Sequence, residues 1–433
     1  MRITRKLAAL GLLAALCLLT LSCAGTDTAP VERRVLLLGV DGLEWDILGP
    51  MMETGRLPNL SRLVAEGAWG EVRSLEYLES PMIWTSISTG KIPEKHGISG
   101  YTRKPWSKRD GVVLTADYRE ARTVWDILGE QGYTAGVTMW LVTWPAEPVN
   151  GYLVSDYVKF DWDSGGQGPE DTTFPPELID EIKGMVVRRD DVPDERAAEF
   201  IVGGMPDGDE FDARIGALKS FIAVDETARA IGLHLAETRP TDLTAVYLAG
   251  VDLVCHQFWV DAFPGTGEPV SEEESRLFGE VIERYYQDAD RVIGEFLEFA
   301  DENTTVIVTS DHGHSGPKPK GDKYAVGIAM HDPSGFIAFW GKDIAGGTEL
   351  AEPSVLDITP TILALYGLPV GEDMDGRVLT EAMAPEFLAA LETSSVTTYE
   401  TGERSRLGEE EAGAESPVDG QVKEQLRSLG YIE

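Results

Sequence analysis

Three short apolar runs, each followed by an aspartate, form the clearest pattern along the chain. They are RRVLLLGVDG (33–42), AVYLAGVD (245–252) and TTVIVTSDHG (304–313). Continuous apolar runs of this length are typical of strands that are buried on both faces of a parallel sheet. Because open α/β sheets bind ligands beyond the carboxyl ends of their strands, we expect the three aspartates to share one edge of a sheet.

Helical patterns lie between the predicted strands. PNLSRLVAEG (58–67) opens with proline and closes with glycine, and TVWDILGEQG (123–132) precedes a strand-like stretch, TAGVTMW. SVLDITPTILALYGLP (354–369) is apolar and amphipathic. Strands that alternate with helices predict an α/β fold with a doubly wound, mostly parallel sheet.

One long segment, residues 160–238, interrupts this alternation. It starts with a loop rich in Gly, Pro and Asp, and helical patterns follow at 177–187 and 212–238. We expect it to be a cap of loops and helices, inserted between the two parts of the α/β domain at 33–159 and 239–392.

The carboxyl-terminal part has a different composition. Residues 393–420 are polar, acidic and poor in apolar side chains, which predicts a flexible linker. Residues 421–433 carry a short amphipathic pattern that predicts a final helix.

The first residues have the features of a secretory signal, predicted at 1–22. A basic start, MRITRK, precedes about fifteen apolar residues, which is short for a membrane span. The sequence LTLSCAG places a small residue directly before Cys23, as in a bacterial lipobox. Cys23 is therefore the predicted lipidated residue of an exported protein anchored to the cell envelope. Cleavage at an ordinary signal site nearby is the alternative.

Charge and cysteine content narrow the classes of partner. Asp and Glu total 74 against 37 Lys and Arg, for a net charge of -37. Such a surface repels nucleic acids, which excludes a nucleic-acid polymer as the main partner. Apart from Cys17 and Cys23 only Cys255 remains, so no disulfide framework is predicted.

Metal-ligand side chains gather at or near the ends of the predicted strands. The candidates are Asp41, Asp252, His256, Asp311, His312 and His331, and they include three of the six histidines. Asp252 and His256 are four residues apart, which places both on one face of a helix. Each motif alone is more typical of a turn or an exposed helix face, but together they predict one metal centre. Mixed carboxylate and imidazole ligands favour zinc or manganese.

A hydroxyl-rich stretch, LESPMIWTSISTG (78–90), offers candidate nucleophiles. Ser80 precedes Pro81, a favoured first helical residue, so Ser80 is predicted to cap a helix. A helix N-terminus favours a bound anion, and a zinc ion lowers the pKa of a bound hydroxyl group. Ser80 is therefore the first candidate, with a purely structural cap as the alternative. Thr85, further along the helix, is the second candidate.

The chain resembles the alkaline phosphatase superfamily and, within it, the type I phosphodiesterase/nucleotide pyrophosphatase branch. The motifs that carry this resemblance lie in order over residues 35–377 and include VLLLGVDGLEWDIL, SPMIWTSISTGKIPEKHGI, AGVDLVCHQFW, TSDHGHSG and HDPSGFIAFWG. The resemblance implies a hydrolase of phosphoric esters with a hydroxyl nucleophile and two divalent metal ions about 4 Å apart.

The resemblance also assigns the ligands. It implies one metal ion bound by the nucleophile together with Asp41, Asp311 and His312. It implies a second metal ion bound by Asp252, His256 and His331, with His314 as the alternative to His331. The family's nucleophile lies nine residues before the Thr of the Thr-Gly turn, which selects Ser80.

The chain departs from the family after the nucleophile. The usual aromatic-Pro-Asn is replaced by Pro-Met-Ile, so an asparagine that helps to hold the phosphoryl oxygens is missing. We expect the backbone N–H of Met82 to substitute, with Trp84 and Thr85 as further substrate-binding candidates. The sulfatase motif C/S-x-P-x-R is not matched here, which argues against a sulfatase.

The predicted function is hydrolysis of a small-molecule, lipid or glycan phosphoester by an exported, lipid-anchored enzyme. A phosphomonoesterase and a transferase of phosphoalcohol groups in the cell envelope are alternatives of the same class. A catalytically inactive binding lipoprotein is the alternative from another class.

Overall fold

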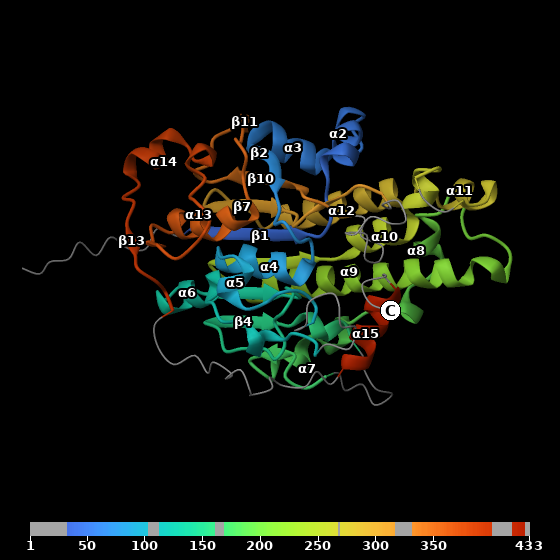
Figure 1. Ribbon diagram of the computed structural model, residues 1–433, viewed down its shortest axis with the longest axis horizontal. Coiled ribbons are helices and arrows are strands. Elements are labelled where there is room, and N and C mark those ends of the chain that lie inside the picture. The colour runs from blue at the N-terminus through green and yellow to red at the C-terminus, as the bar shows by residue number, and fades with distance from the viewer. Residues whose placement is uncertain are drawn as a thin grey trace, which may run out of the picture. The chain divides into compact units, whose positions relative to one another are not determined.

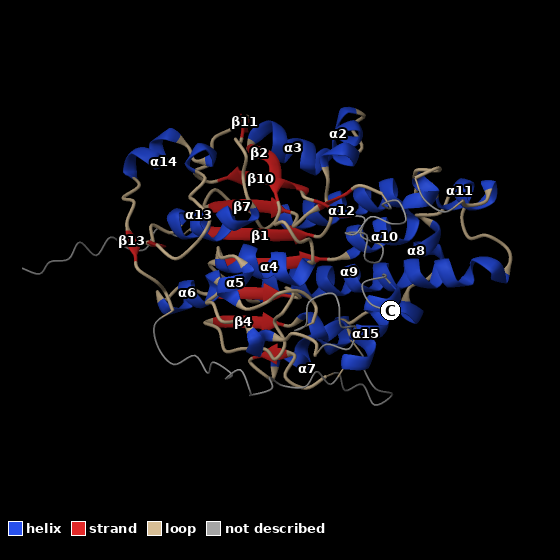
Figure 2. Ribbon diagram, in the orientation of Figure 1, coloured by secondary structure: helices blue, strands red, loops and turns tan. Residues whose placement is uncertain are grey.

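The computed structural model describes residues 33–102, 112–160, 169–266, 269–316, 331–400 and 418–428. Within these ranges the largest sheet has nine strands (Figures 1 and 2). In spatial order they are β11 (Thr348–Glu349), β2 (Ala68–Arg73), β10 (Ser334–Gly341), β7 (Thr304–Thr309), β1 (Arg34–Val40), β6 (Leu243–Leu248), β3 (Ala135–Thr138), β4 (Gly151–Val154) and β5 (Thr173–Phe174).

The five central strands, from β7 to β4, run parallel, and β10 is antiparallel to both of its neighbours. In register, Leu36 of β1 lies opposite Thr244 of β6 and Val306 of β7. The carboxyl ends of these three strands therefore meet at one edge, as the aspartate pattern predicted. This topology confirms the predicted α/β fold with a mostly parallel sheet.

Helices cover both faces of the sheet, and strand β1 supplies apolar side chains to each face. Leu36, Leu38 and Val40 pack in the core formed with α9 (Asp212–Thr238) and α12 (Val281–Leu297). Val35 and Leu37 pack in the core formed with α4 (Ser80–Thr89), α6 (Val124–Glu130) and α13 (Ile358–Leu365). This alternation is the two-residue period of a strand buried on both sides.

Two predicted strands end earlier than the apolar pattern suggested. β6 ends at Leu248, and Asp252 lies instead in the first turn of α10 (Gly250–Ala262). β7 ends at Thr309, two residues before Asp311. The chain turns into a helix after β6 because the N–H groups of Ala249 and Gly250 donate to the carboxylate of Asp225 rather than to a strand.

The segment predicted to be a cap contains α7 (Leu178–Ile182), α8 (Asp194–Ala198) and α9. Helix α9 has the predicted bounds, and its buried Ile222, Ile231 and Leu235 belong to the core on one face of the sheet. Helix α9 is thus part of the layer that supports the sheet.

The carboxyl-terminal part is more structured than its composition suggested. β13 (Ser395–Val396), near the start of the predicted linker, pairs in parallel with β12 (Val370–Gly371). Further on, α15 (Asp419–Ser428) begins beside Val418, which packs with Val422 against Val113, Trp144 and Tyr157. The apolar side chains at 418 and 422 explain why this end docks on the domain.

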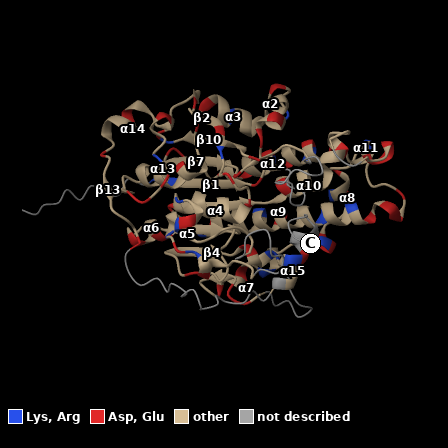
Figure 3. Cartoon of the chain, in the orientation of Figure 1, with Lys and Arg blue, Asp and Glu red and all other residues tan. Residues whose placement is uncertain are grey.

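Figure 3 marks Asp and Glu positions in red on outer helices such as α11 (Glu272–Phe278) and α14 (Pro385–Ala390), while the central strands are largely free of charged positions. Within the ranges that the structure describes, no helix combines the length and apolar character needed to cross a membrane. The predicted signal at 1–22 and Cys23 lie outside these ranges.

Candidate metal and nucleophile site

Asp41 directly follows β1, and two neighbours fix its side chain. Trp84 Nε1 and Tyr247 Oη donate to Asp41 Oδ2 at 3.0 and 2.5 Å. The other oxygen, Asp41 Oδ1, lies 3.4 Å from His312 Nε2 and accepts no hydrogen bond from a described donor. One carboxylate oxygen is therefore held by the protein, and the other is presented toward His312.

Asp311 and His312 come from the loop after β7. Gly42 N donates to Asp311 Oδ1 at 3.4 Å, while Asp311 Oδ2 lies 3.4 Å from His312 Nε2 and accepts no hydrogen bond from a described donor. His312 Nδ1 donates to the carbonyl oxygen of Gly313 at 3.1 Å, which leaves the lone pair on Nε2. Two carboxylate oxygens and one imidazole nitrogen thus converge in a buried space.

A second cluster surrounds Asp252 Oδ1. His314 Nε2 lies at 3.0 Å, His256 and His331 Nε2 each at 3.3 Å, and His312 Nε2 at 4.0 Å. His331 Nδ1 donates to Leu78 O at 2.7 Å, which turns its Nε2 toward Asp252. Four imidazoles around one carboxylate oxygen form a donor set of the type that binds zinc.

The electrostatics of these clusters favour a bound cation. Burial, with the nearby charge of Asp252, raises the pKa of Asp41 to about 7. Burial and the neighbouring Asp41 raise the pKa of Asp311 well above its usual value. The two carboxyl groups are close enough to share a proton when no cation is present, so a divalent ion would replace that proton.

The histidines are held in the form that binds metal. Burial and the neighbouring His331 hold the pKa of His312 well below its usual value, so the imidazole stays neutral. Burial opposes ionisation of Asp252, but the imidazoles of His256, His314 and His331 hold its pKa well below the usual value. The candidate ligand atoms in each of two groups lie within 4.8 Å of one another: Asp41, Asp311 and His312; and Asp252, His312, His314 and His331.

Ser80 lies beside the first cluster. Its Oγ is 3.4 Å from His312 Nε2, the side chain is buried, and Tyr101 hydrogen-bonds to it. Helix α4 begins at Ser80 with Glu79 as the capping residue, so the prediction that Ser80 itself is the cap is wrong by one position. The Pro at position 81 still falls in the first turn, and Ser80 remains at the N-terminus of the helix.

The other hydroxyl groups of α4 are used inside the protein. Thr85 Oγ1 donates to Pro81 O at 2.7 Å, and Ser86 Oγ is 2.9 Å from His96 Nε2. Both are buried. Of the two candidate nucleophiles, Ser80 is the one that the structure brings to a candidate ligand, His312.

The predicted substrate-binding residues have structural contacts here. The backbone N–H of Met82 donates to Glu79 O at 3.0 Å, so it is used within the first turn of α4. Trp84 is fully buried and orients Asp41. Met82 therefore contributes to the first turn of helix α4, and Trp84 orients the Asp41 carboxylate. Neither group is presented on an open surface.

Tyr101 was missed by the sequence patterns. Its backbone N–H donates to Glu79 Oε2 at 2.9 Å, and its side chain reaches Ser80. The glycine before it, Gly100, has a φ of 143° and lies so close to the Glu79 carboxylate that a Cβ would collide with it. No periodicity could predict Tyr101, because its place depends on how the loop folds back onto Glu79.

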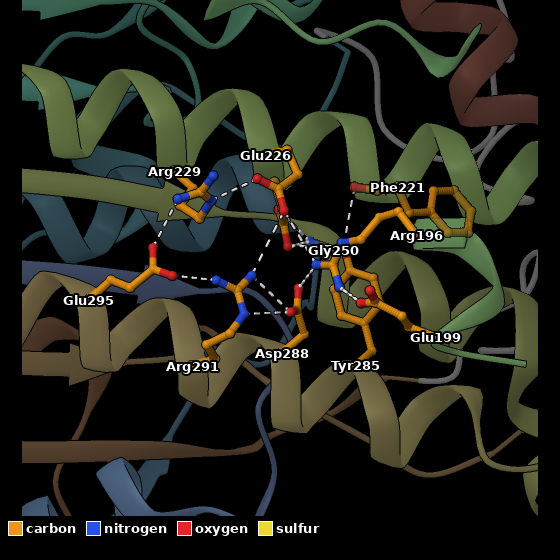
Figure 4. A network of polar contacts seen from close by, with 11 residues as sticks. Arg196, Glu199, Phe221, Glu226, Arg229, Gly250, Tyr285, Asp288, Arg291 and Glu295 are labelled. Atoms are coloured by element: carbon orange, nitrogen blue, oxygen red, sulfur yellow. Dashed lines mark hydrogen bonds and ion pairs between the residues drawn. The ribbon is translucent and has the colours of Figure 1, made fainter. Parts of the chain in front are cut away.

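Asp225 is a second residue that the patterns missed. It lies on α9 and accepts from Ala249 N at 2.9 Å and Gly250 N at 3.0 Å, at the N-terminus of the helix that carries Asp252. Tyr285 Oη of α12 donates to the same carboxylate at 3.1 Å. Figure 4 shows Gly250 and Tyr285 beside a network of ion pairs that joins α8, α9 and α12. The members of this network are Arg196, Glu199, Glu226, Arg229, Asp288, Arg291 and Glu295.

Comparisons with known proteins agree on the fold. A variant of the alkaline phosphatase PafA superposes with a TM-score of 0.52 at 15% identity, over 83% of this chain and 100% of that chain. A Bacteroides thetaiotaomicron protein described as a sulfatase gives 0.51 at 13% identity, over 80% of this chain and 74% of that chain. At these identities the likeness concerns the fold.

Sequence comparisons are more specific. The 2,3-bisphosphoglycerate-independent phosphoglycerate mutase of Rhodopirellula baltica is 37% identical over 86 residues, which cover 18% of this chain and 14% of that protein. The model of the type I phosphodiesterase/nucleotide pyrophosphatase family matches residues 35–342, well over half of the chain. This match confirms the resemblance inferred from the motifs, and the chain belongs to the type I phosphodiesterase/nucleotide pyrophosphatase family.

Proposed function

We propose that this protein hydrolyses phosphoric esters with Ser80 as the nucleophile and two divalent metal ions, zinc or manganese, as cofactors. One observation carries the proposal. His312 Nε2 lies 3.4 Å from Ser80 Oγ and 3.4 Å from each of the buried oxygens Asp41 Oδ1 and Asp311 Oδ2. A serine at a helix N-terminus is thereby joined to a donor set that suits a divalent cation.

The residues that would hold the first metal ion are Asp41, Asp311, His312 and Ser80. The second ion would be held by Asp252, His256 and His331, with His314 as the alternative to His331. When bound, such ions supply Lewis-acid stabilisation of negative charge and lower the pKa of a coordinated hydroxyl group.

The proposed reaction has two chemical steps at Ser80. Ser80 Oγ forms a bond to phosphorus while the bond from phosphorus to the leaving oxygen breaks. The serine proton passes to solvent, and the leaving oxygen takes up a proton from solvent to depart as the alcohol. Water then cleaves the phosphoserine ester, releases phosphate or a monoester, and restores Ser80. The Tyr101 hydroxyl, which contacts Ser80, is placed to donate to a phosphoryl oxygen and would take the role of the missing asparagine.

The test is a panel of phosphate mono- and diesters, a phosphonate and a sulfate ester, each assayed with added zinc or manganese. We expect turnover of phosphate esters, and we expect Ser80→Ala to lower kcat by at least about a thousandfold. The variant Ser86→Ala, whose hydroxyl contacts His96, serves as the control. Full activity of the Ser80 variant would contradict the proposed nucleophile.

Product analysis distinguishes the alternatives. A transferase would deliver the phosphoalcohol group to an added acceptor, and a binding protein would show no turnover when loaded with metal. We also propose that the protein is exported and anchored by lipid at Cys23. Cys23→Ser would then move the protein from the membrane fraction to the soluble fraction of cells that express it, and an unchanged distribution would contradict the anchor.

A further inference from the structure

A pocket extends from the candidate metal site along the carboxyl edge of the sheet. Its lining includes Asp41, Asp252 and Pro81 together with Trp144, Tyr157 and Lys159. The rings of Trp144 and Tyr157 stack with centroids 4.9 Å apart and planes within 5°. The pocket is therefore mainly apolar, with one ammonium group along its wall.

Lys159 has no carboxylate partner among the described residues. Five other lysines each have a carboxylate oxygen within 4.0 Å: Lys91, Lys95, Lys183, Lys219 and Lys342. The contact that Lys159 Nζ makes is with the ring of Phe160, 5.1 Å from its centroid. In a chain with twice as many acidic as basic residues, a half-buried lysine without an ion pair to any described carboxylate is unusual.

Asp156, three residues before Lys159, is hydrogen-bonded by neutral donors. Asp156 Oδ1 accepts from Thr143 N, Thr143 Oγ1 and Ser155 Oγ at 3.2 to 3.3 Å. Burial lowers the pKa of Lys159, while the fields of Asp156, Asp41 and Asp225 oppose that shift. Lys159 thus lines the same pocket as Asp41 and Asp252, and no carboxylate of the described residues is in direct contact with its ammonium group.

We propose that Lys159 is a specificity-determining residue that binds a second negative charge on the substrate. The preferred substrates are then doubly charged phosphoric esters: monoesters, or diesters whose alcohol carries an acidic group. A net charge of -37 repels such anions from the surface, so a local cation is needed to hold them. A charge-assisted contact is stronger in a partly desolvated, apolar pocket than in water. This inference rests on the proposed function.

The experiment compares Lys159→Met and Lys159→Arg on three substrates. They are 4-nitrophenyl phosphate, which carries two charges, bis(4-nitrophenyl) phosphate, which carries one, and the mixed diester of 4-nitrophenol and 4-hydroxybenzoate, whose second charge is on the alcohol part. We expect Lys159→Met to lower kcat/KM about tenfold or more on at least one doubly charged substrate, and less than about twofold on bis(4-nitrophenyl) phosphate. Lys159→Arg should keep most of the wild-type preference.

The pattern of loss identifies where the charge is bound. If kcat/KM falls only for the monoester, Lys159 binds a charge on the phosphoryl group. If kcat/KM falls only for the carboxylated diester, Lys159 binds the charge on the alcohol part. Equal losses on all three substrates, or no selective loss, would overturn the inference. Lys219→Met, which removes the same charge from a lysine that does not line the pocket and is paired with Asp194, is the matched control.

The two proposals fail in different ways. If wild-type protein loaded with metal cleaves no phosphate ester, the proposed function is wrong. If wild-type protein cleaves them and Lys159→Met shows no selectivity for charge, only the role of Lys159 is wrong.

Discussion

Single contacts distinguish His331 from His314 as a candidate ligand. Both Nε2 atoms face Asp252 Oδ1, at 3.3 and 3.0 Å. His331 is oriented through Nδ1 by the carbonyl of Leu78, whereas the ring of His314 packs against Trp259. A backbone carbonyl on the far nitrogen is the usual partner of a metal-bound histidine, so the contacts support His331 as the ligand.

We therefore predict that His331→Ala lowers bound zinc from two ions to one per chain, while His314→Ala retains two. Metal content measured by plasma mass spectrometry after dialysis tests this. His234→Ala, on the exposed side of α9 and paired with Glu181, is the control. A loss of metal in His314→Ala but not in His331→Ala would reverse the assignment.

Residues whose contacts are made with residues far away in the sequence were the hardest to predict. The aspartates and histidines of the candidate metal site stand in short motifs at or near the ends of apolar runs, so the sequence patterns singled them out as candidates. Tyr101 contacts Ser80 only because the loop 97–101 returns to Glu79, and Trp84 holds Asp41 through a contact between a helix and a strand end. Such contacts depend on tertiary packing, which leaves no periodic signal in the chain.

At the scale of elements, α10 carries two candidate ligands and its N-terminus is held by Asp225 of α9. Burial raises the pKa of Asp225 from 3.8 to about 7, although the N–H groups of Ala249 and Gly250 favour the charged form. Between pH 4 and pH 7 the Asp225 carboxyl group is therefore protonated in a larger fraction of folded molecules than of unfolded ones. The stability from the protonated form is complete below pH 4 and is lost as the pH rises toward 7.

We predict that the free energy of unfolding of the wild-type protein falls between pH 4 and pH 7 more steeply than that of Asp225→Asn. Each unit of pKa difference corresponds to about 1.4 kcal/mol, so the difference amounts to a few kcal/mol. Urea unfolding of metal-free protein at several pH values measures it, with Asp180→Asn on the exposed part of α7 as the control. Parallel slopes for wild-type protein and Asp225→Asn would refute the linkage.

The elements show where sequence patterns succeed. Helix α9 matches its predicted bounds, and β1 and β7 lie inside the predicted runs, because apolar periodicity directly reports burial. The end of β6 was placed too late, since Val251 is apolar and buried in helix and strand alike. β13 was missed because a two-residue strand, held by pairing with β12, is too short to show an alternation.

At the scale of the whole molecule, the surface charge opposes the proposed substrates. A net charge of -37 lowers the local concentration of anions, and salt screens this repulsion over about 10 Å at 0.1 M. We predict that kcat/KM for 4-nitrophenyl phosphate rises severalfold between 20 and 200 mM sodium chloride at saturating zinc. The zwitterionic substrate 4-nitrophenyl phosphocholine should change less, and a fall with salt for the anionic substrate would contradict the prediction.

The docking of α15 has a practical consequence for anyone who purifies or visualises the protein. Val422 lines the pocket that contains Asp41 and Asp252, so an affinity tag or a fluorescent protein joined after this helix would follow an element that forms part of the pocket wall. A tag at the amino end would interfere with the predicted lipid attachment at Cys23. The turn at Gln131 and Gly132 is exposed and precedes the amino end of β3, at the opposite edge of the sheet from the candidate metal site. A short epitope inserted there would allow the protein to be detected without contact with the pocket.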